Sequence, residues 1–160
     1  MNKLYLFTVL LFAWLSGCAT SPEFDTTGVD NSLTPQSVIA EPANSKGKMA
    51  IWGGSILSTR NLETTTQIEV LAYPLNASHK PMLDSSPLGR FIIEHQGYLE
   101  PATYKKGLSI SVLGDVSKIQ KGKVGESDYT YPVLGARKIF LWVPGNEPQT
   151  SFHFGIGVRL

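Results

Sequence analysis

The sequence of 160 residues contains one cysteine, Cys18. A single cysteine cannot form a disulfide within its own chain, so packing alone has to hold the fold together. Small domains of oxidising compartments often use disulfides as staples. The chain must therefore bury a hydrophobic core, and its length is sufficient for one domain that does so.

Charge is also scarce. Charged residues make up 17 % of the chain, and 14 Lys and Arg stand against 13 Asp and Glu. If residues 1–17 are removed as a leader, Lys3 is lost and 13 basic residues remain against 13 acidic ones. A neutral chain argues against a nucleic-acid partner, which leaves a basic footprint on a protein. It equally argues against electrostatic adhesion to an anionic lipid surface.

The sequence also lacks the motifs typical of metal sites, of catalytic nucleophiles and of nucleotide binding. His79, His95 and His153 lie far apart, without a second ligand at metal-binding spacing. Ser55 follows two glycines but lies outside any Gly-x-Ser-x-Gly elbow of the serine hydrolases. No carboxylate pair suits glycosidic hydrolysis, and no nucleotide-binding motif occurs. The sequence predicts a protein that is not an enzyme and uses no metal or cofactor, with a hydrolase of envelope material as an alternative.

The N-terminus is the most informative feature that is present. Lys3 is followed by an apolar run, Leu4–Trp14, of signal-peptide length, which is shorter than the ~20 residues that span a bilayer. The run leads into Leu15-Ser16-Gly17-Cys18, which resembles the Leu-x-Gly-Cys lipobox of bacterial lipoproteins. The resemblance implies a signal peptide over 1–17 and a mature Cys18 that carries an S-diacylglycerol group and an N-acyl chain. Two or more acyl chains hold a protein firmly in a membrane. A secreted protein cleaved near Ala19 and a buried structural cysteine are the alternatives.

Residues 18–45 are predicted to be the lipidated cysteine and a flexible tether. Residues 19–33 are rich in Ser, Thr, Pro, Asp and Asn and have little apolar area to offset the entropy of ordering. Thr34 as N-cap and Pro35 at the first helical position predict a short helix that Pro42 ends. A random coil as far as Ser45 would span roughly 30 Å and let the domain stand off the lipid headgroups.

Residues 46–160 are predicted to form a mainly β domain, because apolar and polar residues alternate and no segment has helical periodicity. The glycines Gly53, Gly54 and Gly114 indicate bulges or close backbone approach, which coil a sheet until it closes. We expect a small OB-like closed or partly open β-barrel, with a β-sandwich as the alternative. The expected strands are Met49–Leu57, Thr66–Tyr73, Arg90–His95, Leu108–Ile119, Tyr129–Leu134, Lys138–Val143 and Ser151–Leu160.

An ordered set of short blocks runs through this domain. The blocks are Trp52-Gly53-Gly54-x-Ile56, Glu69-Val70-x-x-Tyr73-Pro74-Leu75, Gly89-Arg90-Phe91, Pro101-x-x-Tyr104-x-x-Gly107, Val112-x-Gly114, Gly125-Glu126-x-x-Tyr129-x-Tyr131-Pro132-Val133 and Leu141-Trp142. Together with the lipobox they resemble the Slp family of starvation-inducible outer-membrane lipoproteins of Gram-negative bacteria. Glu100 and Leu108 depart from the family, where an aspartate and an arginine are expected. The resemblance implies an outer-membrane location facing the periplasm and a link to starvation or stationary-phase stress, but no reaction.

The predicted function is a non-enzymatic binding or envelope-support role. The expected partners are outer-membrane lipid, through acylated Cys18, and an envelope protein or a glycan. The alternative is a glycan- or small-ligand-binding module that uses an aromatic face of the OB-like barrel, and burial of the rings in the core would remove that face. Arg90 is expected to face solvent at the start of a strand, with pairing to Glu69 or Glu126 as the alternative. The candidate surface residues are Trp52, Tyr73, Arg90, Tyr104, Glu126, Tyr129 and Tyr131.

Overall fold

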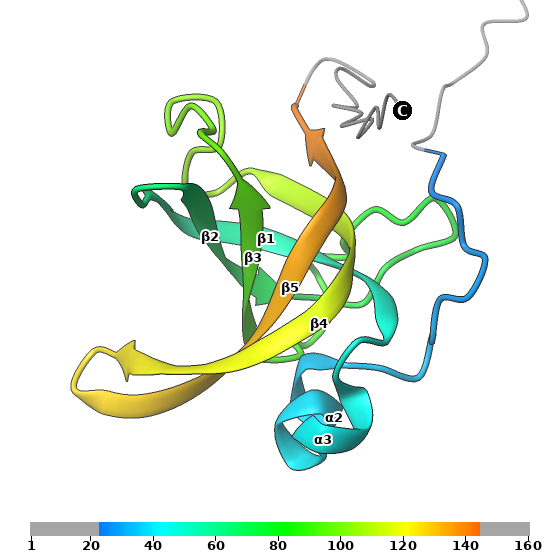
Figure 1. Cartoon of the computed structure of the whole chain (residues 1–160). Coiled ribbons are helices and arrows are strands. Elements are labelled where there is room, and N and C mark those ends of the chain that lie inside the picture. The colour runs from blue at the N-terminus through cyan, green and yellow to red at the C-terminus, as the bar shows by residue number, and fades with distance from the viewer. Residues whose placement is uncertain (1–22, 145–160) are drawn as a thin grey trace, which may run out of the picture.

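The computed structural model describes residues 23–144 of the chain, which form a mainly β domain with two short helices before the first strand (Figure 1). The leader and Cys18 lie outside the described residues, as does the last expected strand, Ser151–Leu160. Among residues 23–144, neither helix has the length and apolar character needed to cross a bilayer. The elements are α2 (Pro35–Ala40), α3 (Pro42–Ser45), β1 (Met49–Asn61), β2 (Thr65–Ala72), β3 (Arg90–Gln96), β4 (Ser109–Val124) and β5 (Ser127–Trp142).

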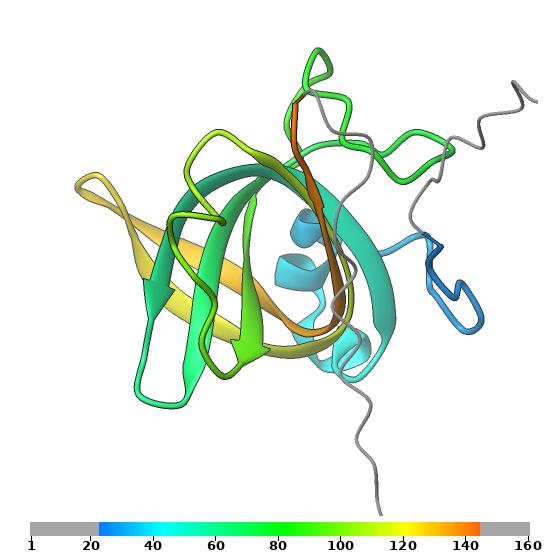
Figure 2. The ribbon, with the colours of Figure 1, turned by 90° about the horizontal axis from the view of Figure 1, so that it is seen from above.

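The five strands close into a ring in the order β1-β2-β3-β5-β4, with β4 returning to β1 (Figure 2). All neighbours are antiparallel except β3 and β5, which run parallel over the short stretch from Ile92↔Val133 to Glu94↔Gly135. Because β3 and β5 pair over so few residues, the ring is not quite a regular barrel. The predicted OB-like closed or partly open barrel is confirmed, and the alternative, a sandwich of two sheets, is not what forms.

The two strands expected over Tyr129–Leu134 and Lys138–Val143 are one strand, β5, so this part of the prediction is wrong. β4 pairs with β5 along its whole length, and bulges in the pairing absorb the bend that a turn would have made. At one bulge Gly114 lies so close to the neighbouring strand that an added Cβ would be 2.4 Å from the carbonyl oxygen of Gly135. Lys121-Gly122-Lys123 has the composition of a turn, with a glycine between two polar residues, but it belongs to β4.

The barrel interior is filled by alternate residues of every strand, as a period-two pattern requires. Phe91 and Ile93 of β3 are fully buried, and the Trp52 ring of β1 packs edge-on against Phe91 with ring centroids 5.2 Å apart. The Trp52 indole Nε1 donates a hydrogen bond to the carbonyl of Leu33 at 2.8 Å. This bond satisfies the one polar group of the ring in the core.

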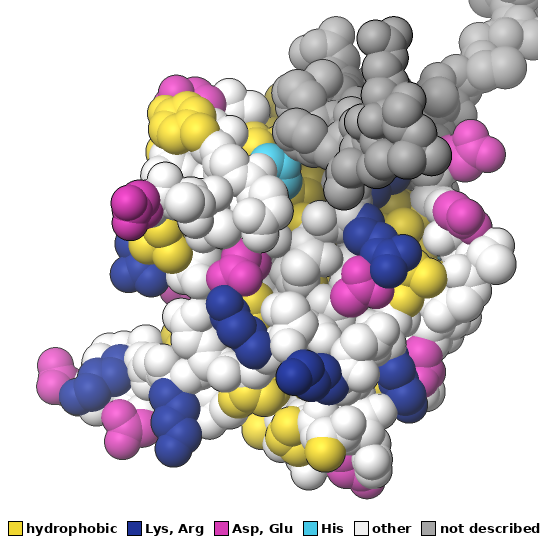
Figure 3. Space-filling model, viewed as in Figure 1, with side chains coloured by type: hydrophobic (Ala, Val, Ile, Leu, Met, Phe, Trp, Pro, Cys, Tyr) yellow, Lys and Arg dark blue, Asp and Glu magenta, His cyan; other side chains and the backbone are white. Residues whose placement is uncertain are grey.

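Charged side chains of both signs are interspersed on the face drawn in Figure 3. Among the ion pairs of the domain, Arg137 pairs with Asp115, with their closest N–O distance at 2.5 Å, and Lys118 pairs with Glu94 at 2.8 Å. This mixture agrees with the near-neutral net charge of the sequence.

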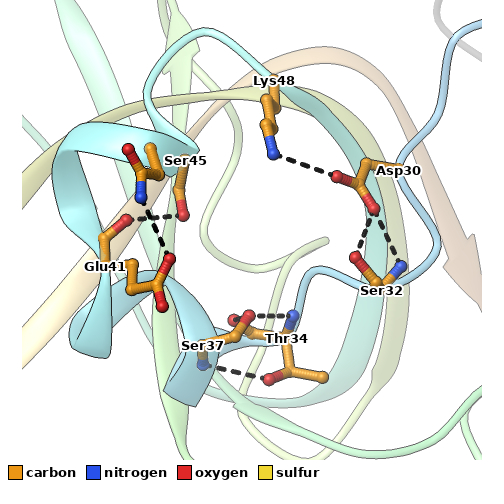
Figure 4. A network of polar contacts seen from close by, with 8 residues as sticks. Asp30, Ser32, Thr34, Ser37, Glu41, Ser45 and Lys48 are labelled. Atoms are coloured by element: carbon orange, nitrogen blue, oxygen red, sulfur yellow. Dashed lines mark hydrogen bonds and ion pairs between the residues drawn. The ribbon is translucent and has the colours of Figure 1, made fainter.

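The segment that precedes β1 closes the end of the barrel drawn lowest in Figure 1. Leu33 and Val38 join the core, and Val38 is fully buried. Thr34 caps α2 as predicted, since its hydroxyl accepts from Ser37 N at 3.1 Å and Ser37 Oγ accepts from Thr34 N at 2.9 Å (Figure 4). The predicted tether is therefore wrong for residues 24–45, because a few apolar side chains suffice when the barrel supplies the surface they cover.

Candidate functional site

A polar groove crosses the outer face of the barrel. It lies between β1, β2 and β3 on one side and, on the other, the projecting end of the β4–β5 hairpin, residues 118–132, which we call the arm (Figure 1). Its volume is about 500 Å³. Residues that face outward in a strand alternate with those in the core, so the groove is lined by the set Ser58, Thr59, Arg60, Gln67, Glu69, Ile92, Gln120, Gly122, Lys123 and Tyr131.

Glu69 of β2 is the centre of one half of the network in the groove. Its Oε1 accepts from Arg90 Nη1 at 2.8 Å and lies 3.1 Å from the hydroxyl of Tyr131. The Tyr131 hydroxyl also lies 3.1 Å from the carbonyl of Lys123 in the arm. The hydrogen bond to Glu69 raises the pKa of Arg90, while burial, followed by the nearby Glu69 charge, raises the pKa of Tyr131. Arg90 thus stays a cation and Tyr131 a neutral donor at physiological pH.

Gln67 of β2 links the strands in the other half. Its Nε2 donates to Glu94 at 3.1 Å and to Gln120 of the arm at 3.2 Å, and its Oε1 accepts from Arg60 at 3.2 Å. Desolvation pushes the pKa of Glu94 upward, but hydrogen bonds from Lys118 and Gln67 outweigh it and lower that pKa overall. Glu94 is therefore an anion already neutralised by Lys118.

In the groove, more positive than negative charge is available to interact with a ligand. Its acidic residue, Glu69, is paired with Arg90. Arg60 and Lys123 are exposed, and neither makes an ion pair with another residue in the range 23–144. Guanidinium and ammonium groups bind carboxylates and phosphates through charge-assisted hydrogen bonds. The groove is suited to a polar ligand that carries an acidic group.

Three of the predicted surface residues meet beside the groove, although Tyr131 is only 5 % exposed and its ring is buried against Ile92 and Val133. The Tyr129 hydroxyl accepts from the backbone N–H of Arg90 at 2.9 Å, and the rings of Tyr129 and Tyr131 are 4.7 Å apart. Arg90 does not simply face solvent as predicted: of the two alternative partners, it pairs with Glu69. Glu126 is exposed in the turn that joins β4 to β5.

The single aromatic face that the alternative function required does not form among the described residues. Trp52 and Tyr104 are 5 % and 4 % exposed and belong to the core, and burial raises the pKa of Tyr104. Tyr73 lines a separate cavity of about 360 Å³ beside Trp52. Tyr98, at 66 % exposed, lies in the loop after β3. The rings are divided between the core and separate surfaces, so stacking on a shared platform is not available.

The described histidines do not meet in the groove. His79 packs edge-on against Phe24 with ring centroids 5.4 Å apart, and His95 is buried in β3, where desolvation lowers its pKa. His153 lies outside the described residues. Within residues 23–144, no three His, Cys, Asp or Glu side chains are grouped so that they could hold a metal ion.

The groove residues that sequence reasoning missed are Arg60, Gln67, Gln120 and Lys123. Gln67 and Gln120 are 53 residues apart, and nothing local indicates that they touch. The only signal that could have suggested Gln67 is its outward place in the alternating pattern of β2.

Comparison with known proteins gives several matches. Residues 15–156 match the family model described as the outer membrane lipoprotein Slp family. The chain is 34 % identical to an uncharacterized protein of Haemophilus influenzae over 147 residues, which cover 88 % of this chain and 77 % of the relative. It is 29 % identical to the uncharacterized lipoprotein YeaY of Escherichia coli over 124 residues, 75 % of this chain and 62 % of YeaY. It is 24 % identical to the outer membrane protein Slp of Escherichia coli over 142 residues, 87 % and 74 % of the two chains. No solved structure matches.

Proposed function

The chain belongs to the outer membrane lipoprotein Slp family, and from this membership we propose that acyl chains on Cys18 anchor it in the outer membrane. The barrel then faces the periplasm and acts by binding an envelope component, or by supporting the envelope, without catalysing a reaction. Its resemblance to starvation-inducible lipoproteins supports a role during starvation or stationary phase.

The observation that carries this proposal is the agreement of a local motif with the family match. The match begins at residue 15 and so includes all of Leu15-Ser16-Gly17-Cys18. A thiolate is a soft nucleophile suited to forming a thioether with a diacylglyceryl group. Each buried methylene of an acyl chain contributes about 0.8 kcal/mol, so several chains hold the protein without help from surface charge.

Replacing Cys18 tests the anchor. In cells that express Cys18→Ser, the protein is expected to move from the membrane fraction to the soluble fraction, because serine cannot carry the thioether. Ser16→Ala changes the variable position of the motif and is the control, which should stay in the membrane. Fractionation and the mass of the mature N-terminus measure both. A Cys18→Ser protein that remains membrane-bound would overturn the proposal.

The groove supports a second candidate function, the binding of an acidic glycan. A sugar chain presents hydroxyl groups to the amide of Gln120, and an acidic group on it can reach Arg60 or Lys123. The observation that favours this ligand class is the pair of exposed cations beside an acidic residue that is already paired.

Charge removal tests this second function. Soluble peptidoglycan fragments carry carboxylates. The double variant Arg60→Ala/Lys123→Ala is expected to bind them at least about tenfold more weakly. A tenfold change corresponds to about 1.4 kcal/mol, and one charged hydrogen bond contributes about 1.5–3 kcal/mol. Lys105→Ala/Lys106→Ala removes the same charge from an exposed loop outside the groove. Titration calorimetry compares the two, and an equal loss in both, or no binding by the unaltered protein, would contradict the assignment.

A further inference from the structure

The N-terminal segment is fixed to the barrel almost from the first described residue. Lys138 Nζ of β5 donates to the carbonyl of Glu23. The next side chain, Phe24, is 6 % exposed and packs with Leu113 of β4 and Phe140 of β5 on the outside of the ring. The chain therefore leaves the barrel at this outer face and not after the helices.

The distance from this point to the anchor is short. Cys18 and Glu23 are five residues apart in the sequence. A fully extended chain spans at most 3.3–3.6 Å per residue, so their separation is at most about 18 Å whatever path the chain takes. The roughly 30 Å of coil expected from a tether that reaches Ser45 is not available.

We propose that the outer face of the barrel around Phe24 lies against the phospholipid headgroups of the membrane in which Cys18 is anchored. The inference rests on the proposed acylation of Cys18, which holds that residue at the membrane surface. A tether this short keeps the face at an effective concentration in the millimolar range, so weak contacts with headgroups are sufficient to orient the barrel.

The side chains of this face suit a headgroup layer. Lys80 Nζ lies 5.3 Å from the ring centroid of Trp142, and Lys138 Nζ lies 5.6 Å from that of Phe24. The ammonium groups can meet lipid phosphates, and a half-buried tryptophan is favoured at the membrane–water interface. Asp25, also on this segment, is acidic and exposed. The short tether, and not net charge, is what holds the face in place.

The same orientation turns the groove toward the periplasm. Phe24 packs over β4 and β5 next to the start of β1, whereas the groove lies over the other end of β1, over β2 and β3, and under the arm. Both ribbon views place the arm on the side of the molecule opposite the first described residues (Figures 1 and 2). A ligand in the periplasm would thus reach the groove without passing the bilayer.

Fluorescence quenching in vesicles tests the orientation. Because acyl chains occupy Cys18, Ala77→Cys provides a single free thiol, to which a fluorophore is attached. Ala77 is exposed, and His79 of the same loop contacts Phe24. The matched control is Ser127→Cys, which is exposed at the end of the arm. The full acylated chain is reconstituted in vesicles of phosphatidylethanolamine and phosphatidylglycerol that contain lipid with a nitroxide on its headgroup. The label at position 77 is expected to lose most of its fluorescence, and the label at position 127 to keep most of it.

A longer tether provides the second measurement. About twelve Gly and Ser residues inserted between Ser21 and Pro22 lengthen the reach severalfold. The label at position 77 should then recover fluorescence toward the level at position 127. Equal quenching of the two labels in the protein without the insertion would overturn the inference alone. Protein that does not float with the vesicles would overturn the anchor and the inference together.

Discussion

Replacing Gly54 by alanine is expected to destabilise the barrel by about 3 kcal/mol or more, at or beyond the upper end of the usual cost of overpacking. Gly54 lies in β1 and pairs with Ala72 of β2 and Ile110 of β4. A Cβ at this position would be 1.9 Å from the carbonyl oxygen of Leu71. That atom belongs to the backbone of the neighbouring strand, so the clash cannot be relieved by a change of rotamer. The strands must separate, and their ladder and the core beneath it are disturbed together.

Gly135→Ala is the matched control for this change. Gly135 also lies in a long strand, but a Cβ there would be 3.8 Å from the nearest heavy atom, the carbonyl oxygen of Asp115. Its effect should stay within about 0.5 kcal/mol. Urea unfolding of the mature, non-acylated chain measures the free energy of unfolding of both variants. In thermal unfolding of the same chain, Gly54→Ala should lower the melting temperature by roughly 10 °C. Two variants that unfold alike would show that β1 and β2 do not approach this closely.

The second large effect is expected at Val38, in the short helix α2. Val38 is fully buried among core residues that include Leu33. Val38→Asp would place a carboxylate there without a partner, and such a group either costs several kcal/mol or forces the helix out of the barrel. We expect a loss of roughly 4 kcal/mol and faster proteolysis of residues 24–45. The same charge at the exposed position Gln36 of α2, in Gln36→Asp, should change the stability by less than about 0.5 kcal/mol.

This comparison decides whether the segment before β1 is part of the domain. If Val38→Asp and Gln36→Asp unfold at the same urea concentration, residues 24–45 act as a free tether, as their composition suggests. In that case the barrel would also stand farther from the membrane than the attachment of Phe24 allows.

The strands could be predicted from the sequence because burial on one side of a sheet repeats every two residues. The lengths of β4 and β5 could not be predicted, because a glycine can either make a turn or lie within a strand where another group approaches closely. Gly122 suggests a turn, yet it lies in β4, where a Cβ would come 3.0 Å from the Tyr131 ring. The turn is made instead at Gly125, whose φ is +59°.

The candidate site was predicted only in part. Arg90, Tyr129 and Tyr131 lie in the short blocks typical of the family, and they do meet. Trp52 and Tyr104 lie in similar blocks, but their side chains are buried in the core. A block of residues typical of a family indicates that a position matters and leaves open whether its side chain faces inward or outward.

The amino-acid sequence alone determined the features that depend on near neighbours: the lipobox, the alternation that makes the domain mainly β, the cap of α2 and the close approach at Gly53 and Gly54. The tertiary structure decided which strands meet, that β3 runs parallel to β5, that the N-terminal segment closes the barrel, and which outward side chains form the groove. The physical reason is the range of the contacts. A cap or an alternating strand is set within a few residues, whereas Gln67 meets Gln120 across 53 residues and Glu69 meets Tyr131 across 62, and only the closed ring brings them together.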